Sequence, residues 1–200
     1  MNSNDGGSEV FRKRAALLQP LELGSVNLRN RVVISPMQEY AAGPDGLARD
    51  FHFVHLGRYA LGGAGLVFTE ALAVVPEGRL TYSDLGIWND AQIEPLARIA
   101  DFLRSQGAAA GTQILHAGRK ASVQRPWHGY EPMSELDVRE RGEAPWNTVG
   151  PSAEPALPGW PVPRALSVGE IAEVVEAHAV AARRCSTCSW VIRPFLAVFS

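Results

Sequence analysis

Three short apolar runs dominate the N-terminal part of the chain, and each ends abruptly in polar side chains. They span residues 31–34, 64–69 and 108–115. Continuous apolar and β-branched runs of this length are typical of strands buried on both faces. Segments with apolar residues at three- and four-residue spacing separate the runs, as expected of helices. Alternating strands and helices predict parallel βα units, and hence an α/β fold with a ligand site across the mouth of a barrel of parallel strands.

Local signals place the flanking elements. A hairpin is predicted at 17–30, with its turn at Gly24-Ser25. Helices are predicted from Asp50, from Asn89 or Asp90, and from the capping box formed by Ser167 and Glu170. The periodic face of the first helix comprises Phe51, Val54, His55, Arg58 and Leu61, and that of the last comprises Ile171, Val174, Val175, His178 and Ala182.

Composition narrows the possible partners and the compartment. The net charge of -2 gives no electrostatic reason to expect nucleic acid or an anionic membrane as a partner. No apolar run reaches the length of a membrane span, and residues 1–10 lack the apolar core of a signal peptide. We therefore expect a cytoplasmic protein with a flexible tail at 1–16. Cys185 and Cys188 are interpreted as incidental thiols in a reducing compartment.

The ends of the three predicted strands carry the candidate site. They are Ser35–Tyr40, Glu70-Ala71 and Gln113–Lys120. No Ser-His-Asp order, metal-spaced histidine and carboxylate cluster, or glycine-rich dinucleotide motif accompanies them. Amide and backbone groups remain, and a glutamine offers both a donor and an acceptor. This set is suited to hydrogen-bonding a flat heterocycle with an imide edge.

Three segments carry a family resemblance: Leu23–Tyr40, Asp84–Trp88 and Gln113–Lys120. Together they resemble the N-terminal half of the old yellow enzyme family of NAD(P)H:flavin oxidoreductases, in its branch of bacterial ene-reductases and xenobiotic reductases. The resemblance implies part of a TIM (β/α)8 barrel with FMN at its C-terminal face. It also implies a ping-pong reaction, in which NAD(P)H reduces the flavin and the flavin then reduces an activated C=C bond of a small molecule.

The resemblance also implies roles for individual residues. The implied FMN-contacting positions are Ser35, Pro36, Met37, Gln38, Ala71 and Gln113. Gln38 would lie beside flavin N5 and O4, where the family often has Cys or Thr. The Ala71 amide would meet O4, Gln113 would pair with the pyrimidine edge, and Tyr40 would face the substrate.

The resemblance ends at residue 184. The family's next strand carries a histidine pair that binds the substrate, but no histidine follows His178 in this chain. We therefore expect three parts: a tail at 1–16, the N-terminal part of an FMN-binding barrel at 17–184, and a non-family tail at 185–200. A frameshift or premature stop would explain the last part. The flavin-contacting arginine and phosphate site of the later half are also missing, so we expect weak FMN retention and impaired activity.

Two alternatives remain open. One is the larger dienoyl-CoA-reductase-like branch, whose cysteine-rich cluster segment lies beyond this region. The other is an inactive fragment, or an interaction module that acts through the loop at 121–165, which holds eight of the 14 prolines. Full-length family members are often homo-oligomers. The resemblance does not distinguish NADH from NADPH.

Overall fold

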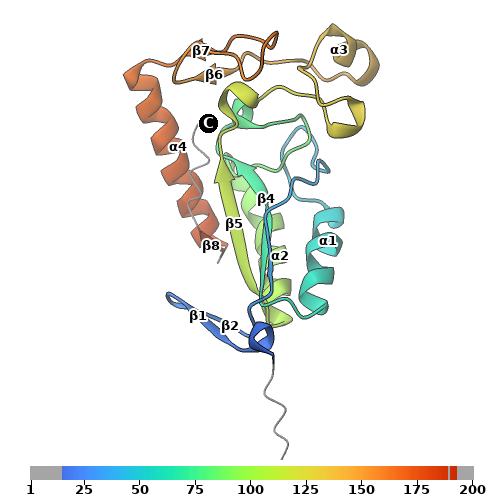
Figure 1. Ribbon diagram of the computed structural model, residues 1–200, viewed down its shortest axis with the longest axis vertical. Helices are drawn as coiled ribbons and strands as arrows, with labels where there is room; N and C mark the ends of the chain where they lie inside the picture. Colours follow the sequence, from blue (N-terminus) through green and yellow to red (C-terminus); the bar gives the residue numbers. More distant parts are fainter. Residues whose placement is uncertain (1–14, 189, 193–200) are drawn as a thin grey trace, which may run out of the picture.

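A four-stranded parallel sheet forms the centre of the molecule. The computed structural model describes residues 15–188 and 190–192 (Figure 1). The sheet order is β3-β4-β5-β8, which follows the order along the chain. Its strands are β3 (Val33–Ile34), β4 (Leu66–Ala73), β5 (Ala109–Leu115) and β8 (Val191–Ile192). All three pairings are parallel, as predicted for β3, β4 and β5, whereas β8 lies in the segment 185–200, where no strand was predicted. The sheet does not close into a barrel within the described residues.

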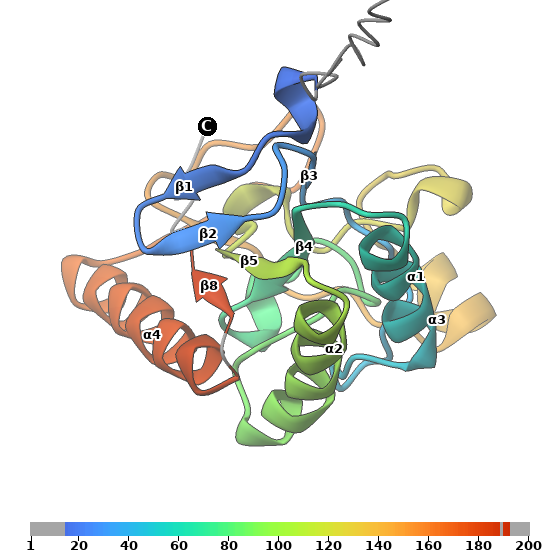
Figure 2. The same cartoon turned by 90° about the horizontal axis from the view of Figure 1, so that it is seen from below.

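Three helices cover one side of this sheet. They are α1 (Asp50–Leu61), α2 (Ile93–Ser105) and α4 (Val168–Thr187). Seen from below, they form an arc in which α2 lies between α1 and α4 (Figure 2). The predicted capping box opens α4, since the Ser167 side chain accepts from the Glu170 amide. None of the helices among the described residues is both long and apolar enough to cross a membrane.

The predicted hairpin crosses the N-terminal ends of the strands. It consists of β1 (Leu21–Leu23) and β2 (Val26–Leu28), paired antiparallel (Figure 2). Gly24 has a φ of +62°, which suits a tight turn between the two strands. Arg29 anchors the hairpin, because its guanidinium donates to the carbonyl oxygens of Ala60 and Ala64 at 2.8 and 2.9 Å. The hairpin thus closes the end of the sheet that is opposite the candidate site.

The predicted inner face of α1 is wrong. Phe51 and Val54 are 49% and 67% exposed, whereas His52, Leu56, Gly57 and Ala60 are buried. Small residues on the buried face explain the rotation. A Cβ at Gly57 would lie 2.8 Å from the ring of Phe102 on α2, so this close approach of the two helices requires glycine.

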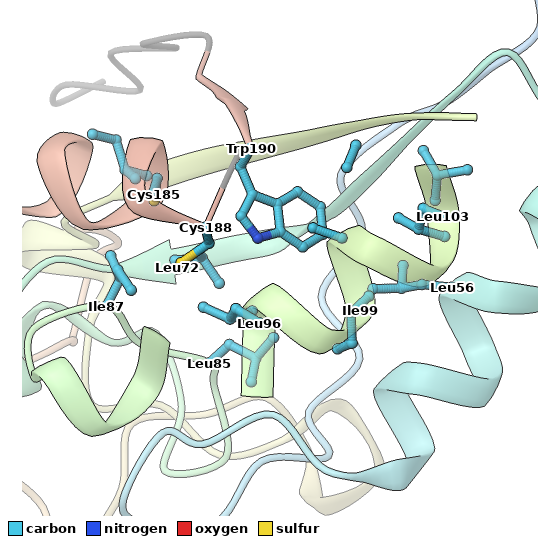
Figure 3. Packing of buried hydrophobic residues seen from close by; sticks show 14 of the residues in the cluster. Leu56, Leu72, Leu85, Ile87, Leu96, Ile99, Leu103, Cys185, Cys188 and Trp190 are labelled. Atoms are coloured by element: carbon cyan, nitrogen blue, oxygen red, sulfur yellow. The ribbon is translucent and has the colours of Figure 1, made fainter. Parts of the chain in front are cut away.

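The core between α4 and the sheet includes both cysteines. Cys185, Cys188 and Trp190 are buried beside Leu72 and Leu96 (Figure 3). The predicted periodic face of α4 is correct only in part. Of the predicted residues, Ala182 packs half-buried against the core, while Ile171 and Val175 are exposed on the N-terminal half of the helix. The buried residues of the helix, Ala181 and Cys185, were not part of the predicted face.

The expected three-part division of the chain stays a prediction. The tail at 1–16 lies almost wholly outside the described residues, as do residues 193–200. Helix α4 runs through the expected boundary at 184 and ends at Thr187.

The segment 121–165 lies across the C-terminal ends of the strands (Figure 1). It contains α3 (Glu135–Arg141) and pairs β6 (Val149–Gly150) with β7 (Arg164–Ala165). Two side-chain hydrogen bonds are among the contacts that tie it to the loop after β4: the Trp146 indole donates to the Glu77 carbonyl at 2.9 Å, and Arg125 donates to the Ser83 hydroxyl at 2.8 Å. A pocket of about 380 Å³ opens within this segment, beside Arg119.

Candidate functional site

The structure brings residues of the three predicted strand tips together, but Glu70 and Ala71 lie inside β4, which continues to Ala73, and not after it. Gln38, which follows β3, accepts through Oε1 from the backbone N–H of Ala71 at 2.9 Å. Ala71 is in turn the direct partner of Gln113 across β4 and β5. The three predicted residues therefore form a continuous row over three neighbouring strands.

A β-bulge shapes the middle of this row. The register between β4 and β5 shifts between Phe68 and Ala71. Bulges of this kind redirect side chains and are common next to functional sites. Inside the shifted stretch, the Thr69 hydroxyl lies 2.8 Å from the Thr112 hydroxyl on β5, and the Glu70 side chain lies against α1.

Two polar side chains of the row have hydrogen-bonding groups without a partner among the described residues. The Gln113 carboxamide is half-buried and has no hydrogen bond to any described residue. Gln38 Nε2 is buried and has no partner there either. Beside them, the side chains of Ser35 and Met37 are exposed, and Met37 reaches 45%. The row can hydrogen-bond the edge of a flat heterocycle while Met37 offers apolar contact.

Tyr40 lies at the outer end of the same tip. Its φ of +54° is uncommon for a residue other than glycine, and such strain is concentrated at functional sites. The ring meets Trp127 edge-to-face, with 5.8 Å between the centroids. Burial and the neighbouring Tyr130, Asp84 and Glu70 raise the pKa of Tyr40 to about 12. The hydroxyl therefore keeps its proton at neutral pH and can donate a hydrogen bond.

Two carboxylate–histidine pairs adjoin the row, and sequence reasoning missed both. Glu39 Oε1 lies 2.8 Å from His55 Nε2, and Glu70 Oε1 lies 3.2 Å from His52 Nε2. Neither histidine had a predicted role in the site. Two features of the sequence could have indicated these pairs. One is the acid Glu70 at the end of a predicted strand, directly before Ala71. The other is the presence of two histidines three residues apart in one predicted helix.

Burial is the main cause of the pKa shifts of Glu70 and His55 in these pairs. Glu70 is 2% exposed, and burial is the main reason why its pKa rises to about 6. Asp84 raises it further, while His52 and the Glu39 amide oppose the shift. Burial also lowers the pKa of His55, against the opposing effect of Glu39.

A second buried carboxylate, Asp84, organises the loop after β4. It accepts from the backbone N–H groups of Leu80 and Thr81 at 2.7 and 3.1 Å, and from the Thr81 hydroxyl at 2.6 Å. Burial raises its pKa. The segment 84–88, quoted above for its resemblance, thus contributes loop structure: Leu85 and Ile87 are fully buried.

The basic residues after β5 do not join the row. His116 is buried, and its Nδ1 accepts from the Gly118 amide at 3.0 Å, which makes it part of the turn. Burial lowers the pKa of His116, so the ring is neutral. Arg119 pairs with Glu154 at 3.6 Å, in the segment 121–165.

Comparison with known proteins identifies the family. The model of the NADH:flavin oxidoreductase / NADH oxidase family matches residues 16–191. The chain belongs to this family. An NADH:flavin oxidoreductase of Gibberella zeae is 41% identical over 180 residues, or 90% of this chain and 41% of that protein. An NADPH dehydrogenase of Listeria welshimeri is 50% identical over 106 residues, or 52% of this chain and 31% of that protein.

Solved structures agree on the fold. Morphinone reductase has a TM-score of 0.72 and 27% identity, covering 88% of this chain and 46% of that one. The old yellow enzyme homologue from Zymomonas mobilis has a TM-score of 0.70 at 23% identity, which supports the fold alone. The predicted old yellow enzyme resemblance and partial (β/α)8 barrel are confirmed. The chain spans less than half the length of the curated relatives described here.

Proposed function

We propose that this chain forms one side of an FMN site in an NAD(P)H-dependent oxidoreductase that reduces activated C=C bonds. The observation that carries the proposal is the row Gln38–Ala71–Gln113, with two polar groups that have no partner among the described residues. Membership of a flavin oxidoreductase family supports it. Bound FMN would supply the hydride chemistry that links oxidation of NAD(P)H to reduction of the substrate.

The residues fit the edge of the isoalloxazine ring, except that Gln38 replaces the Ala71 N–H as the expected donor. The Gln113 carboxamide can donate to and accept from the imide edge of the pyrimidine ring. The Ala71 N–H already donates to Gln38 Oε1, so in this arrangement Gln38 Nε2 is the group that can donate to the ligand. Ser35, Pro36 and Met37 would lie along the ring system. Tyr40, which retains its proton at neutral pH, would face the substrate as a hydrogen-bond donor.

Quenching of FMN fluorescence on titration with the purified chain tests the proposal. We expect saturable but weak binding, because no phosphate contact is part of the proposed site. Gln113→Ala removes two neutral hydrogen bonds, each worth about 1 kcal/mol, and should weaken binding roughly tenfold or more. Gln106→Ala is the matched control: Gln106 is a half-buried glutamine at the opposite end of β5. No saturable quenching, or equal affinities for the two variants, would contradict the proposal.

A further inference from the structure

Two consecutive residues of β4 hold two consecutive residues of the β3 tip. The Ala71 N–H donates to the Gln38 side chain at 2.9 Å. Its neighbour Glu70 accepts through Oε2 from the backbone N–H of Glu39 at 3.1 Å. Together these bonds form a clamp that fixes the position of Gln38 in the row.

The Glu70 half of the clamp is a buried charge without a cation. Its side chain is fully buried, and Oε1 has no aligned hydrogen-bond donor although His52 Nε2 is 3.2 Å away. The Arg49 amide donates to His52 Nδ1 at 2.9 Å, so in this arrangement that ring nitrogen acts as an acceptor. A buried carboxylate with so little compensation costs stability, and such costs are characteristic of functional sites.

Charged and titratable groups face Glu70 from three elements. Helix α1 contributes His52, the loop after β4 contributes Asp84, and the β3 tip contributes Glu39 and Tyr40. The Glu39 carboxylate is itself paired with His55. Strand β5 contributes the uncharged Thr112, next to Thr69. None of these groups is a permanent cation.

We propose that Glu70 is a positioning residue whose carboxylate keeps the clamp closed and whose protonation opens it. An ionised acceptor binds an N–H about twice as strongly as a neutral one, so proton uptake weakens the bond to the Glu39 amide. Burial raises the pKa of Glu70 to about 6, which brings this change into an accessible pH range. With the clamp open, Gln38 can leave Ala71, and the Ala71 N–H becomes available to a ligand.

Amide NMR of the flavin-free chain, from about pH 5 to pH 8, tests the clamp directly. We expect the Glu39 and Ala71 amide signals to shift with a common midpoint near the Glu70 pKa. Both shifts should vanish in Glu70→Gln, whose side chain cannot ionise. A flat profile in the unmodified chain, or an unchanged midpoint in Glu70→Gln, would overturn the proposal.

Two further variants keep the test decisive if Glu70→Gln does not fold. Gln38→Ala should abolish the shift at Ala71 and retain it at Glu39, because it removes only the link to Ala71. His55→Asn should leave both shifts in place, because the proposal assigns them to Glu70 and not to the Glu39–His55 pair. Retention of the Ala71 shift in Gln38→Ala, or its loss in His55→Asn, would refute the clamp.

The consequence for ligand binding rests on the proposed FMN site, whereas the NMR titration does not. If that site is correct, the FMN dissociation constant should differ between about pH 5 and pH 7.5 in the unmodified chain and not in Glu70→Gln. Absence of FMN binding with intact NMR titrations would refute the proposed function and leave the clamp standing. Equal pH dependence of FMN binding in both proteins would refute the role of the clamp.

Discussion

Glu70 and Asp84 are both buried carboxylates with raised pKa values, but their surroundings differ. Asp84 accepts three hydrogen bonds from residues three and four positions before it and so closes its own loop. Glu70 accepts one aligned hydrogen bond, from the distant Glu39, and its second oxygen has no aligned donor.

This difference distinguishes an acid with a structural role from an acid whose protonation state can change. Where every oxygen is satisfied locally, losing the carboxylate disrupts a loop. Where the carboxylate is poorly compensated and joins two strand tips, its charge costs stability but controls a contact within the candidate site. Variants of the two acids should therefore have opposite effects on stability at neutral pH.

The largest expected effect comes from Asp84→Ala. It leaves three donors without an acceptor in a buried turn, so we expect the free energy of unfolding to fall by about 3 kcal/mol. Urea denaturation followed by circular dichroism would measure it. Asp90→Ala is the matched control, because Asp90 is an exposed acid in a surface pair with Arg184, worth about 1 kcal/mol at most. Similar losses of unfolding free energy in both variants would show that Asp84 contributes no more to stability than an exposed surface acid.

Glu70→Gln should act in the opposite direction. A pKa raised to about 6 means that the folded state binds the proton more tightly than the unfolded state. Stability from this group is therefore highest below the unfolded pKa and is lost as pH rises through about 6, by about 2 kcal/mol in total.

Unfolding free energies at about pH 4.5 and pH 7.5 would measure that change. We expect the variant to be more stable than the unmodified chain at the higher pH only, and its dependence on pH to be shallower. Glu94→Gln, at an exposed position on α2, serves as the control. A variant that is destabilised equally at both pH values would show that Glu70 is a structural acid like Asp84.

The smallest effect is expected for Thr81→Val. This nearly isosteric change removes the hydroxyl that donates to Asp84 Oδ1 at 2.6 Å, and it should cost about 1 kcal/mol. Thermal unfolding would measure the loss. A cost as large as that of Asp84→Ala would show that the hydroxyl, rather than the two backbone amides, holds the turn together.

Sequence reasoning predicted the fold where local patterns and packing agree. The hairpin turn at Gly24, the alternation of strands with helices and the Ser167 cap all appear as expected. The inner face of α1 was predicted wrongly, because apolar periodicity points to Phe51 and Val54 while the close approach to α2 selects Gly57. Small residues can mark a buried face that hydrophobic patterning overlooks.

The candidate site was predictable only in its backbone framework. The predicted strand ends included Gln38, Ala71 and Gln113. Contacts between neighbouring strands place these three residues in one row. The pairing of Gln38 with Ala71 depends on the path of the chain after β3, and the burial of Glu70 depends on a register shift that no local pattern encodes. The two histidine pairs depend in addition on the rotation of α1.

The corner where α4 meets β8 provides a built-in reporter of local opening. Its two thiols, Cys185 and Cys188, are the only ones in the chain, and both are buried. Burial raises the pKa of Cys185 to about 12, so thiolate is scarce while this corner is packed. The rate of alkylation of these thiols would therefore measure how often α4 separates from the sheet, without any engineered label.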